Sequence, residues 1–143
     1  MKKNKGFTLI ELLVAMTIMA MLMAIALVSY QGARKSARDG RRRADLEQIR
    51  SALEMCRTDA GAYPNTIYDN EGNISCVVDT ESQIYLTGTP KDPSTTDEYY
   101  YSPNAVNGTY SLCAFLETGG DDSCGDDEGC GVGRTCNYQT KNP

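Results

Sequence analysis

The chain has no histidine, and so it lacks the side chain that most often serves as a general base in enzymes. No two cysteines have the short C-x-x-C spacing, which weakens a zinc interpretation. No glycine-rich phosphate-binding loop and no metal triad is found. The remaining side chains offer no nucleophile–base arrangement, and we therefore predict that the protein is not an enzyme.

Proline is also absent before Pro64, so no helix breaker interrupts the N-terminal part of the chain. The largely apolar run from Phe7 to Val28 is long enough to cross a bilayer as a helix. Its single carboxylate is Glu11, and a charge at the centre of a membrane helix costs on the order of 3 kcal/mol, less near an end. Glu11 is therefore either tolerated at the headgroup level or held by a partner, and the residues alone leave both readings open.

Residues 6–11 read Gly-Phe-Thr-Leu-Ile-Glu, and three lysines precede them. This stretch, followed by an apolar helix, resembles the class III signal of type IV prepilins and type II secretion pseudopilins. The resemblance implies that residues 1–6 are a leader, which a prepilin peptidase removes by cutting between Gly6 and Phe7. It also implies that the new N-terminus of Phe7 is methylated and that 7–28 is a transmembrane and assembly helix.

The same resemblance gives Glu11 a partner. Cleavage creates an α-amine on Phe7, and in a filament Glu11 is expected to meet the Phe7 amine of a neighbouring subunit. An unpaired charge is expensive in an apolar core, so this pairing would fix the axial register of the subunits.

The helix is predicted to continue beyond the membrane span, over 29–60. Apolar side chains recur there at intervals of three and four and form one stripe: Leu46, Ile49, Leu53, Cys56 and Ala60. Gly61 is the expected stop signal, and Gly32 and Gly40 are expected weak points at which the helix bends or melts.

Six basic residues crowd into 31–43, against one acid, Asp39: they are Arg34, Lys35, Arg38, Arg41, Arg42 and Arg43. We favour a solvated helix surface near anionic lipid headgroups. A second interpretation places these residues against the acidic domains of neighbouring subunits. A third, DNA binding, ranks lowest because the bases lie beside the membrane segment, few aromatics interleave with them, and the chain beyond residue 44 is strongly acidic.

Residues 61–143 are predicted to form a globular β domain. Short strands are expected at 76–78, 83–86, 99–102 and 109–116, and Asn107-Gly108 supplies turn residues for a hairpin between the last two. The apolar face of 109–116 is expected to pack on the Leu46–Ala60 stripe. The order of helix, loop and short antiparallel sheet predicts an α+β fold, and it resembles the pilin fold.

The cysteines lie outside the membrane span and are even in number: Cys56, Cys76, Cys113, Cys124, Cys130 and Cys136. In a small extracytoplasmic domain this predicts disulfides, although fifteen pairings remain open. The segment from Gly119 to Cys136 is rich in glycine and acids, cannot build a core, and is expected to be an acidic loop pinned to the sheet, with Cys113 as one candidate anchor.

Calcium is a candidate ligand of this loop, because clustered carboxylates supply the oxygens that it prefers. The resemblance to major pseudopilins implies calcium in roughly this region, and Asp121 and Asp122 are the residues that would carry it. A solvated acidic loop without metal is the favoured alternative.

Taken together, we expect a structural subunit of a type IV pilus or a pilus-like filament. Its partners would be further copies of itself in a helical filament, the prepilin peptidase, the membrane and the pilus assembly machinery. It would lie in the membrane as a prepilin and then in an extracellular filament at the cell surface. The alternatives are a type II secretion pseudopilin, a competence pilin for DNA uptake, and, from another class, a membrane-tethered binding module that never polymerises.

Overall fold

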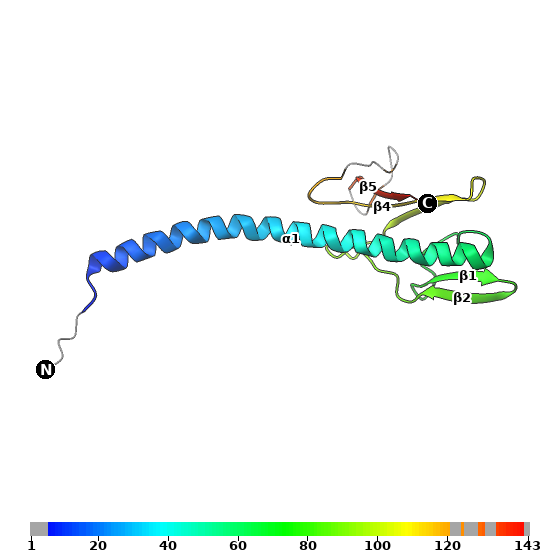
Figure 1. Ribbon diagram of the computed structural model, residues 1–143, viewed down its shortest axis with the longest axis horizontal. Helices are drawn as coiled ribbons and strands as arrows, with labels where there is room; N and C mark the ends of the chain where they lie inside the picture. The colour runs from blue at the N-terminus through cyan, green and yellow to red at the C-terminus, as the bar shows by residue number, and fades with distance from the viewer. Residues whose placement is uncertain (1–5, 121–123, 125–128, 131–133, 142–143) are drawn as a thin grey trace. The chain divides into compact units, whose positions relative to one another are not determined.

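A computed structural model describes residues 6–120, 124, 129–130 and 134–141 of the chain. One helix is followed by five strands: α1 (Leu9–Ala60), β1 (Ile74–Val78), β2 (Glu81–Leu86), β3 (Tyr100–Asn104), β4 (Thr109–Ala114) and β5 (Tyr138–Lys141) (Figure 1). Internal contacts divide the chain into two units, residues 1–35 and residues 36–143, and each is described by itself.

The first unit contains the N-terminal part of α1. Its large apolar side chains are exposed, with Ile10 at 71% and Met21 at 73% of their full accessible surface. The helix is long and apolar enough to cross a membrane. An apolar surface of this kind is stable only against lipid or against other apolar helices. Membrane anchoring by this segment is therefore supported.

The second unit is organised on the remainder of α1. The helix runs without interruption through Gly32 and Gly40, so it does not melt at these glycines. It ends at Ala60, where Gly61 adopts a φ of 77° and donates its N–H to the carbonyl of Arg57 at 2.9 Å. A glycine in the left-handed region at this position is a common helix stop, as the sequence predicted.

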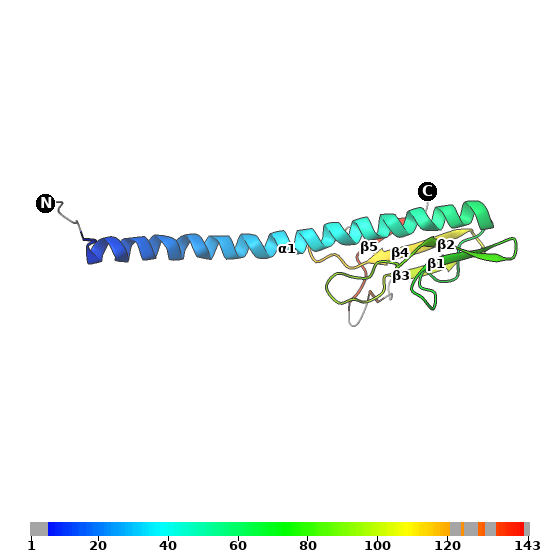
Figure 2. The ribbon, with the colours of Figure 1, turned by 90° about the horizontal axis from the view of Figure 1, so that it is seen from below.

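Two antiparallel sheets pack in this unit instead of the single sheet that was expected. β1 pairs with β2, and the second sheet has the order β3-β4-β5. Figure 2 shows β1, β2, β3 and β4 on one side of α1. β5, which the sequence analysis missed, joins the outer edge of β4 with Ala114 opposite Tyr138.

The core forms where the helical stripe meets β4. Leu46, Ile49 and Leu53 are fully buried in one cluster with Tyr110 and Leu112. Burying a leucine- or isoleucine-sized side chain stabilises a fold by roughly 2 kcal/mol, so this contact is a major source of stability. The predicted packing of the β4 face on the stripe, and the α+β class, are confirmed.

All six cysteines are paired in the structure. Cys56 on the last turns of α1 bonds to Cys76 on β1, with their Cα atoms 6.0 Å apart. Cys113 on β4 bonds to Cys124, and Cys130 bonds to Cys136. The first bond therefore ties the β1–β2 hairpin to the helix, and the other two staple the C-terminal region, with Cys113 as the anchor on the sheet.

Candidate functional site

The predicted cleavage point lies in exposed backbone before the helix. Gly6, Phe7 and Thr8 precede the first helical residue, and the Phe7 side chain is 88% exposed. A Cβ added to Gly6 would meet no atom of the described residues within 4 Å. The bond between Gly6 and Phe7 is thus open to an approaching peptidase, although the cleavage itself stays a prediction.

Thr8 and Glu11 form a reciprocal cap at the start of α1. The Thr8 hydroxyl oxygen accepts the backbone N–H of Glu11 at 3.3 Å. The backbone N–H of Thr8 donates to Glu11 Oε2 at 3.0 Å, and the Thr8 hydroxyl donates to the same oxygen at 2.7 Å. This is a capping box, which satisfies two N–H groups that a helix start otherwise leaves unpaired.

The capping box gives Glu11 a partner that the sequence analysis did not consider. The signal was available, because Thr-x-x-Glu in front of an apolar run is the sequence pattern of this cap. A carboxylate in the first turn also interacts favourably with the positive end of the helix dipole. Only Oε2 is engaged, so Glu11 Oε1 has no hydrogen-bond partner among the described residues and remains open to a second, cationic partner.

A second cluster of charges lies in the other unit, around Arg42. This side chain is completely buried, whereas the sequence analysis placed it on a solvated basic surface, and that interpretation is wrong for Arg42. Its Nε and Nη2 atoms donate to the two carboxylate oxygens of Asp92 at 2.7 and 3.0 Å. Nη1 donates to Asp39 at 2.7 Å and to Glu117 at 3.1 Å, and Nη2 also donates to the Ser94 hydroxyl at 2.8 Å.

Arg38 and Asp39 extend this cluster along the helix. The Nε and Nη2 atoms of Arg38 donate to the two carboxylate oxygens of Glu117, each at 2.6 Å. Asp39 accepts the backbone N–H groups of Glu117 and Thr118 at 2.9 and 2.8 Å, together with the Thr118 hydroxyl at 2.7 Å. We call Arg38, Asp39, Arg42, Asp92 and Glu117 the ionic cluster. It joins the helix to the turn after Pro90 and to the segment that follows β4.

The cluster keeps its carboxylates ionised. Hydrogen bonds from Arg38, with a smaller contribution from Arg42, lower the pKa of Glu117 to about 2. Burial alone would raise the pKa of Asp92, but the hydrogen bonds from Arg42 and Ser94 outweigh it and hold that pKa well below its usual range. For Asp39, burial is likewise outweighed by hydrogen bonds from Thr118 and Glu117, and its pKa is lowered. The ionic cluster therefore keeps its charges and its ion pairs at neutral pH.

The other bases of the 31–43 run differ in their surroundings. Arg43 lies over the ring of Tyr138, with its guanidinium carbon 5.4 Å from the ring centroid. Arg41 is exposed and makes no hydrogen bond or ion pair with the described residues. Because Arg38 and Arg42 are occupied by carboxylates, the run offers fewer free cations to DNA than its composition indicates.

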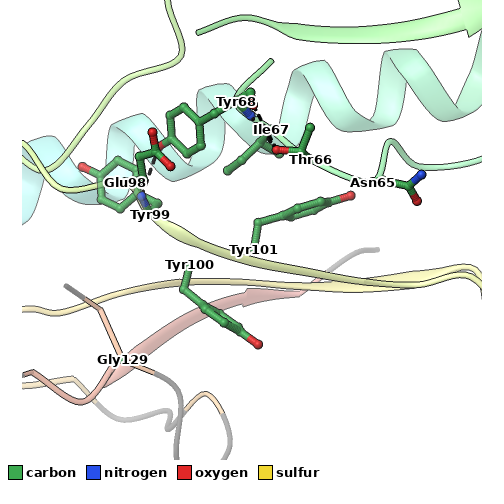
Figure 3. Close-up of a pocket in the computed structure, with 9 residues that line it drawn as sticks. All are labelled: Asn65, Thr66, Ile67, Tyr68, Glu98, Tyr99, Tyr100, Tyr101 and Gly129. Carbon is green, nitrogen blue, oxygen red and sulfur yellow. Dashed lines mark hydrogen bonds between the residues drawn. The ribbon is translucent and has the colours of Figure 1, made fainter. Parts of the chain in front are cut away.

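A hollow of about 300 Å³ lies between residues 65–68 and 98–101 (Figure 3). The hydroxyls of Tyr68 and Tyr101, two tyrosines that line it, are used by the fold itself. Tyr68 donates to the carbonyl of Pro90 at 2.8 Å and accepts the N–H of Tyr99 at 3.1 Å. Tyr101 donates to the carbonyl of Pro64 at 2.8 Å. These contacts brace the loop against β3, and they do not point to a ligand.

The structure provides no test of the predicted calcium site. Asp121 and Asp122 lie outside the described residues. Within the described part of the chain, no group of three or more Asp, Glu, Cys or His side chains could hold a metal ion. The nearby Glu117 is occupied by Arg38 and Arg42. Calcium binding therefore stays a prediction that rests on the resemblance.

Comparison with known families gives two matches, one at the N-terminus and one over the rest of the chain up to residue 132. Residues 1–27 match the prokaryotic N-terminal methylation motif. Residues 29–132, which are most of the chain, match the type II secretion system (T2SS), protein G. The chain belongs to the T2SS protein G family. The suspected resemblance to pseudopilins is thereby confirmed, and so is the expectation of a structural subunit that is not an enzyme.

Individual relatives agree with this assignment. The type II secretion system core protein G of Vibrio cholerae is 30% identical over 108 residues, 72% of this chain and 74% of that protein. The core protein G of Pseudomonas aeruginosa is 28% identical over 133 residues, 87% of this chain and 94% of that protein. The type IV major fimbrial protein FimA of Dichelobacter nodosus is 40% identical over 56 residues, only 39% of this chain and 36% of that protein. No solved structure shows a significant match.

These matches change the order of our two leading interpretations. The protein G matches cover most of both chains, whereas the fimbrial match covers less than half of each. The secretion pseudopilin, given above as an alternative, is better supported than the type IV pilus subunit.

Proposed function

We propose that this protein G homologue is a structural subunit of a type II secretion pseudopilus, a filament assembled from membrane-anchored prepilins. The observation that carries the proposal is the protein G match over residues 29–132, which spans nearly all of the folded domain. The exposed apolar part of α1 supports it, because such a helix needs lipid before assembly and other helices afterwards.

The N-terminal geometry indicates how one helix serves both states. In the single chain, Thr8 holds Glu11 Oε2 and fixes the start of the helix at Leu9. The peptidase would then cut exposed backbone two residues before that start, between Gly6 and Phe7. The new Phe7 amine of a neighbouring subunit would be received by Glu11 Oε1, without the capping box having to break.

This order of events has an energetic reason. A carboxylate in an apolar surrounding is stabilised by each hydrogen bond and opposite charge that it gains. A capped Glu11 would therefore enter the filament core with one of its two carboxylate oxygens already hydrogen-bonded. The amine of the neighbour would complete the set. Partners beyond other copies of the chain would be the prepilin peptidase, the membrane and the secretion machinery.

The experiment compares secretion with pilus formation in the native host. Deleting the gene should abolish export of type II substrates, and the wild-type gene should restore it. A Glu11→Ala gene should give a stable membrane-bound subunit that does not restore export, whereas Glu11→Asp should restore part of it. Mass spectrometry of the mature chain should find a methylated N-terminus at Phe7.

Two other results would each favour a different function. Normal export in the deletion strain, together with the loss of surface fibres, would refute the pseudopilus and favour the type IV pilus subunit that the FimA match supports. A mature chain that begins at Met1 and never enters a filament would leave the membrane-tethered binding module.

A further inference from the structure

Arg41 is a charged side chain on the uncovered face of α1. Its neighbours on that face, three, four and seven residues away, are uncharged and exposed: Ala37, Ala44 and Gln48. The opposite face, which contains Asp39, Arg42 and Leu46, is buried. Arg41 is thus an exposed cation on a shallow, accessible surface, with no ionic partner among the described residues of its own chain.

The β1–β2 hairpin carries the opposite charge at its turn. Asp79 and Glu81 are both exposed, and neither carboxylate bonds to another described residue. We call these two residues the acidic tip. Val77 and Ile84 lie on one face of the same hairpin and are 67% and 55% exposed. Glu81 is paired with Val78 and therefore occupies a position of the other face, at the turn.

The acidic tip cannot reach Arg41 of its own chain. The Cys56–Cys76 disulfide holds β1 against the last turns of α1, and the hydroxyl of Tyr85 on β2 donates to Asp59 at 2.9 Å. Figure 1 shows the turn between β1 and β2 beyond the C-terminal end of α1. Arg41 lies fifteen residues before Cys56, about 22 Å along a helix that rises 1.5 Å per residue.

We propose that Arg41 of one copy receives the acidic tip of a second copy. A contact between two different surfaces at opposite ends of the same domain is heterologous, and heterologous contacts that do not close into a ring build open helical assemblies. Charge complementarity selects the partner. The inference rests on the proposed function, because it assigns an interface of the filament.

The test uses charge reversal in the full chain, produced in cells together with its assembly machinery. Arg41→Glu and Glu81→Lys each place like charges opposite one another. Asp79 has a φ of 58°, which asparagine tolerates better than lysine does, so Asp79→Asn is the appropriate change there. Glu98→Lys is the control: Glu98 is an exposed carboxylate on a different loop, where it pairs with the exposed Lys91 at 3.0 Å.

The yield of filaments sheared from cells is measured by electron microscopy and immunoblotting. Arg41→Glu and Glu81→Lys should each lower it at least tenfold, Asp79→Asn should lower it severalfold, and Glu98→Lys should leave it within twofold of wild type. The combined Arg41→Glu and Glu81→Lys chain should recover most of the wild-type yield. Unchanged melting temperatures of the single variants in detergent would show that the losses are not losses of folding.

Three outcomes would overturn the inference. Normal filaments from both reversals would show that this surface is not used. A defect in Arg41→Glu alone, without rescue by Glu81→Lys, would assign Arg41 to a different occupant, such as anionic lipid headgroups. If the wild-type chain itself forms no filament, the proposed function fails and the inference fails with it, whereas wild-type filaments with indifferent variants refute the inference alone.

Discussion

Replacing Arg42 with alanine should destabilise the domain by about 3–5 kcal/mol, the range for removing one partner of a buried ion pair. The guanidinium makes five hydrogen bonds, and its loss would leave Asp92 and Asp39 buried without their counter-ion. Most of the cost therefore comes from the carboxylates left behind. Arg42→Lys should recover only part of the lost stability, because an ammonium group cannot make the bidentate contact with Asp92.

The assay is urea denaturation of the full chain in detergent, with its disulfides intact. Arg41→Ala is the matched control, one residue away on the exposed face, and should cost less than about 0.5 kcal/mol. A combined Arg42→Met and Asp92→Leu chain should be more stable than Arg42→Ala, because it removes one stranded carboxylate. A loss below about 1 kcal/mol for Arg42→Ala would refute the argument that this ion pair is buried and essential to the fold.

Two further predictions concern pH and the start of the helix. The pKa values of Glu117, Asp92 and Asp39 are lower in the folded chain than in the unfolded one, so their stabilisation is complete above about pH 5 and is lost as the pH falls toward 2. Thermal melts in detergent should show this loss, and a melting temperature that is flat from pH 6 to pH 2.5 would contradict it. Thr8→Val removes the capping hydroxyl and should speed hydrogen exchange at the Glu11 amide several-fold, about 1 kcal/mol of local stability, whereas Thr8→Ser should preserve protection. Equal exchange in wild type and Thr8→Val would exclude the capping role.

The parts of the fold that the sequence predicted are those encoded by local periodicity. The stripe from Leu46 to Cys56 repeats at intervals of three and four, and the alternation in β4 marks its buried face. Gly61 marks the helix end because the residue at this position adopts a left-handed backbone conformation, which glycine takes up without strain. These signals need no knowledge of distant residues, and the structure agrees with them.

The parts that escaped prediction depend on distant partners. Arg42 appears as one base in a basic run until Asp92 and Glu117, fifty and seventy-five residues away, are placed beside it. Its position three residues before Asp45 and four before Leu46, on the buried stripe, was the signal that it faces inward. β5 is short and polar, and it becomes a strand only because the edge of β4 is available to it. The disulfide pairing likewise follows from the fold and could not be obtained by counting.

The N-terminal site likewise has features that the sequence predicted and one that was missed. Gly6, Phe7 and Glu11 were predicted from their order in the chain, and their roles stay predictions. The capping box was equally local and was overlooked because Glu11 was considered only as a membrane charge in search of a distant partner. Which neighbouring residue finally contacts Glu11 Oε1 is a property of an assembly that a single chain does not contain.

The two attachments of the β domain to α1 have a mechanical consequence. Arg42 fastens the domain by charge and Cys56 fastens it covalently, fourteen residues or about 21 Å further along the rod. A force applied along the helix is therefore shared between these two attachments, and it does not pull the domain away from the helix at one end. A subunit built in this way would transmit load along the helix axis as a single stiff part.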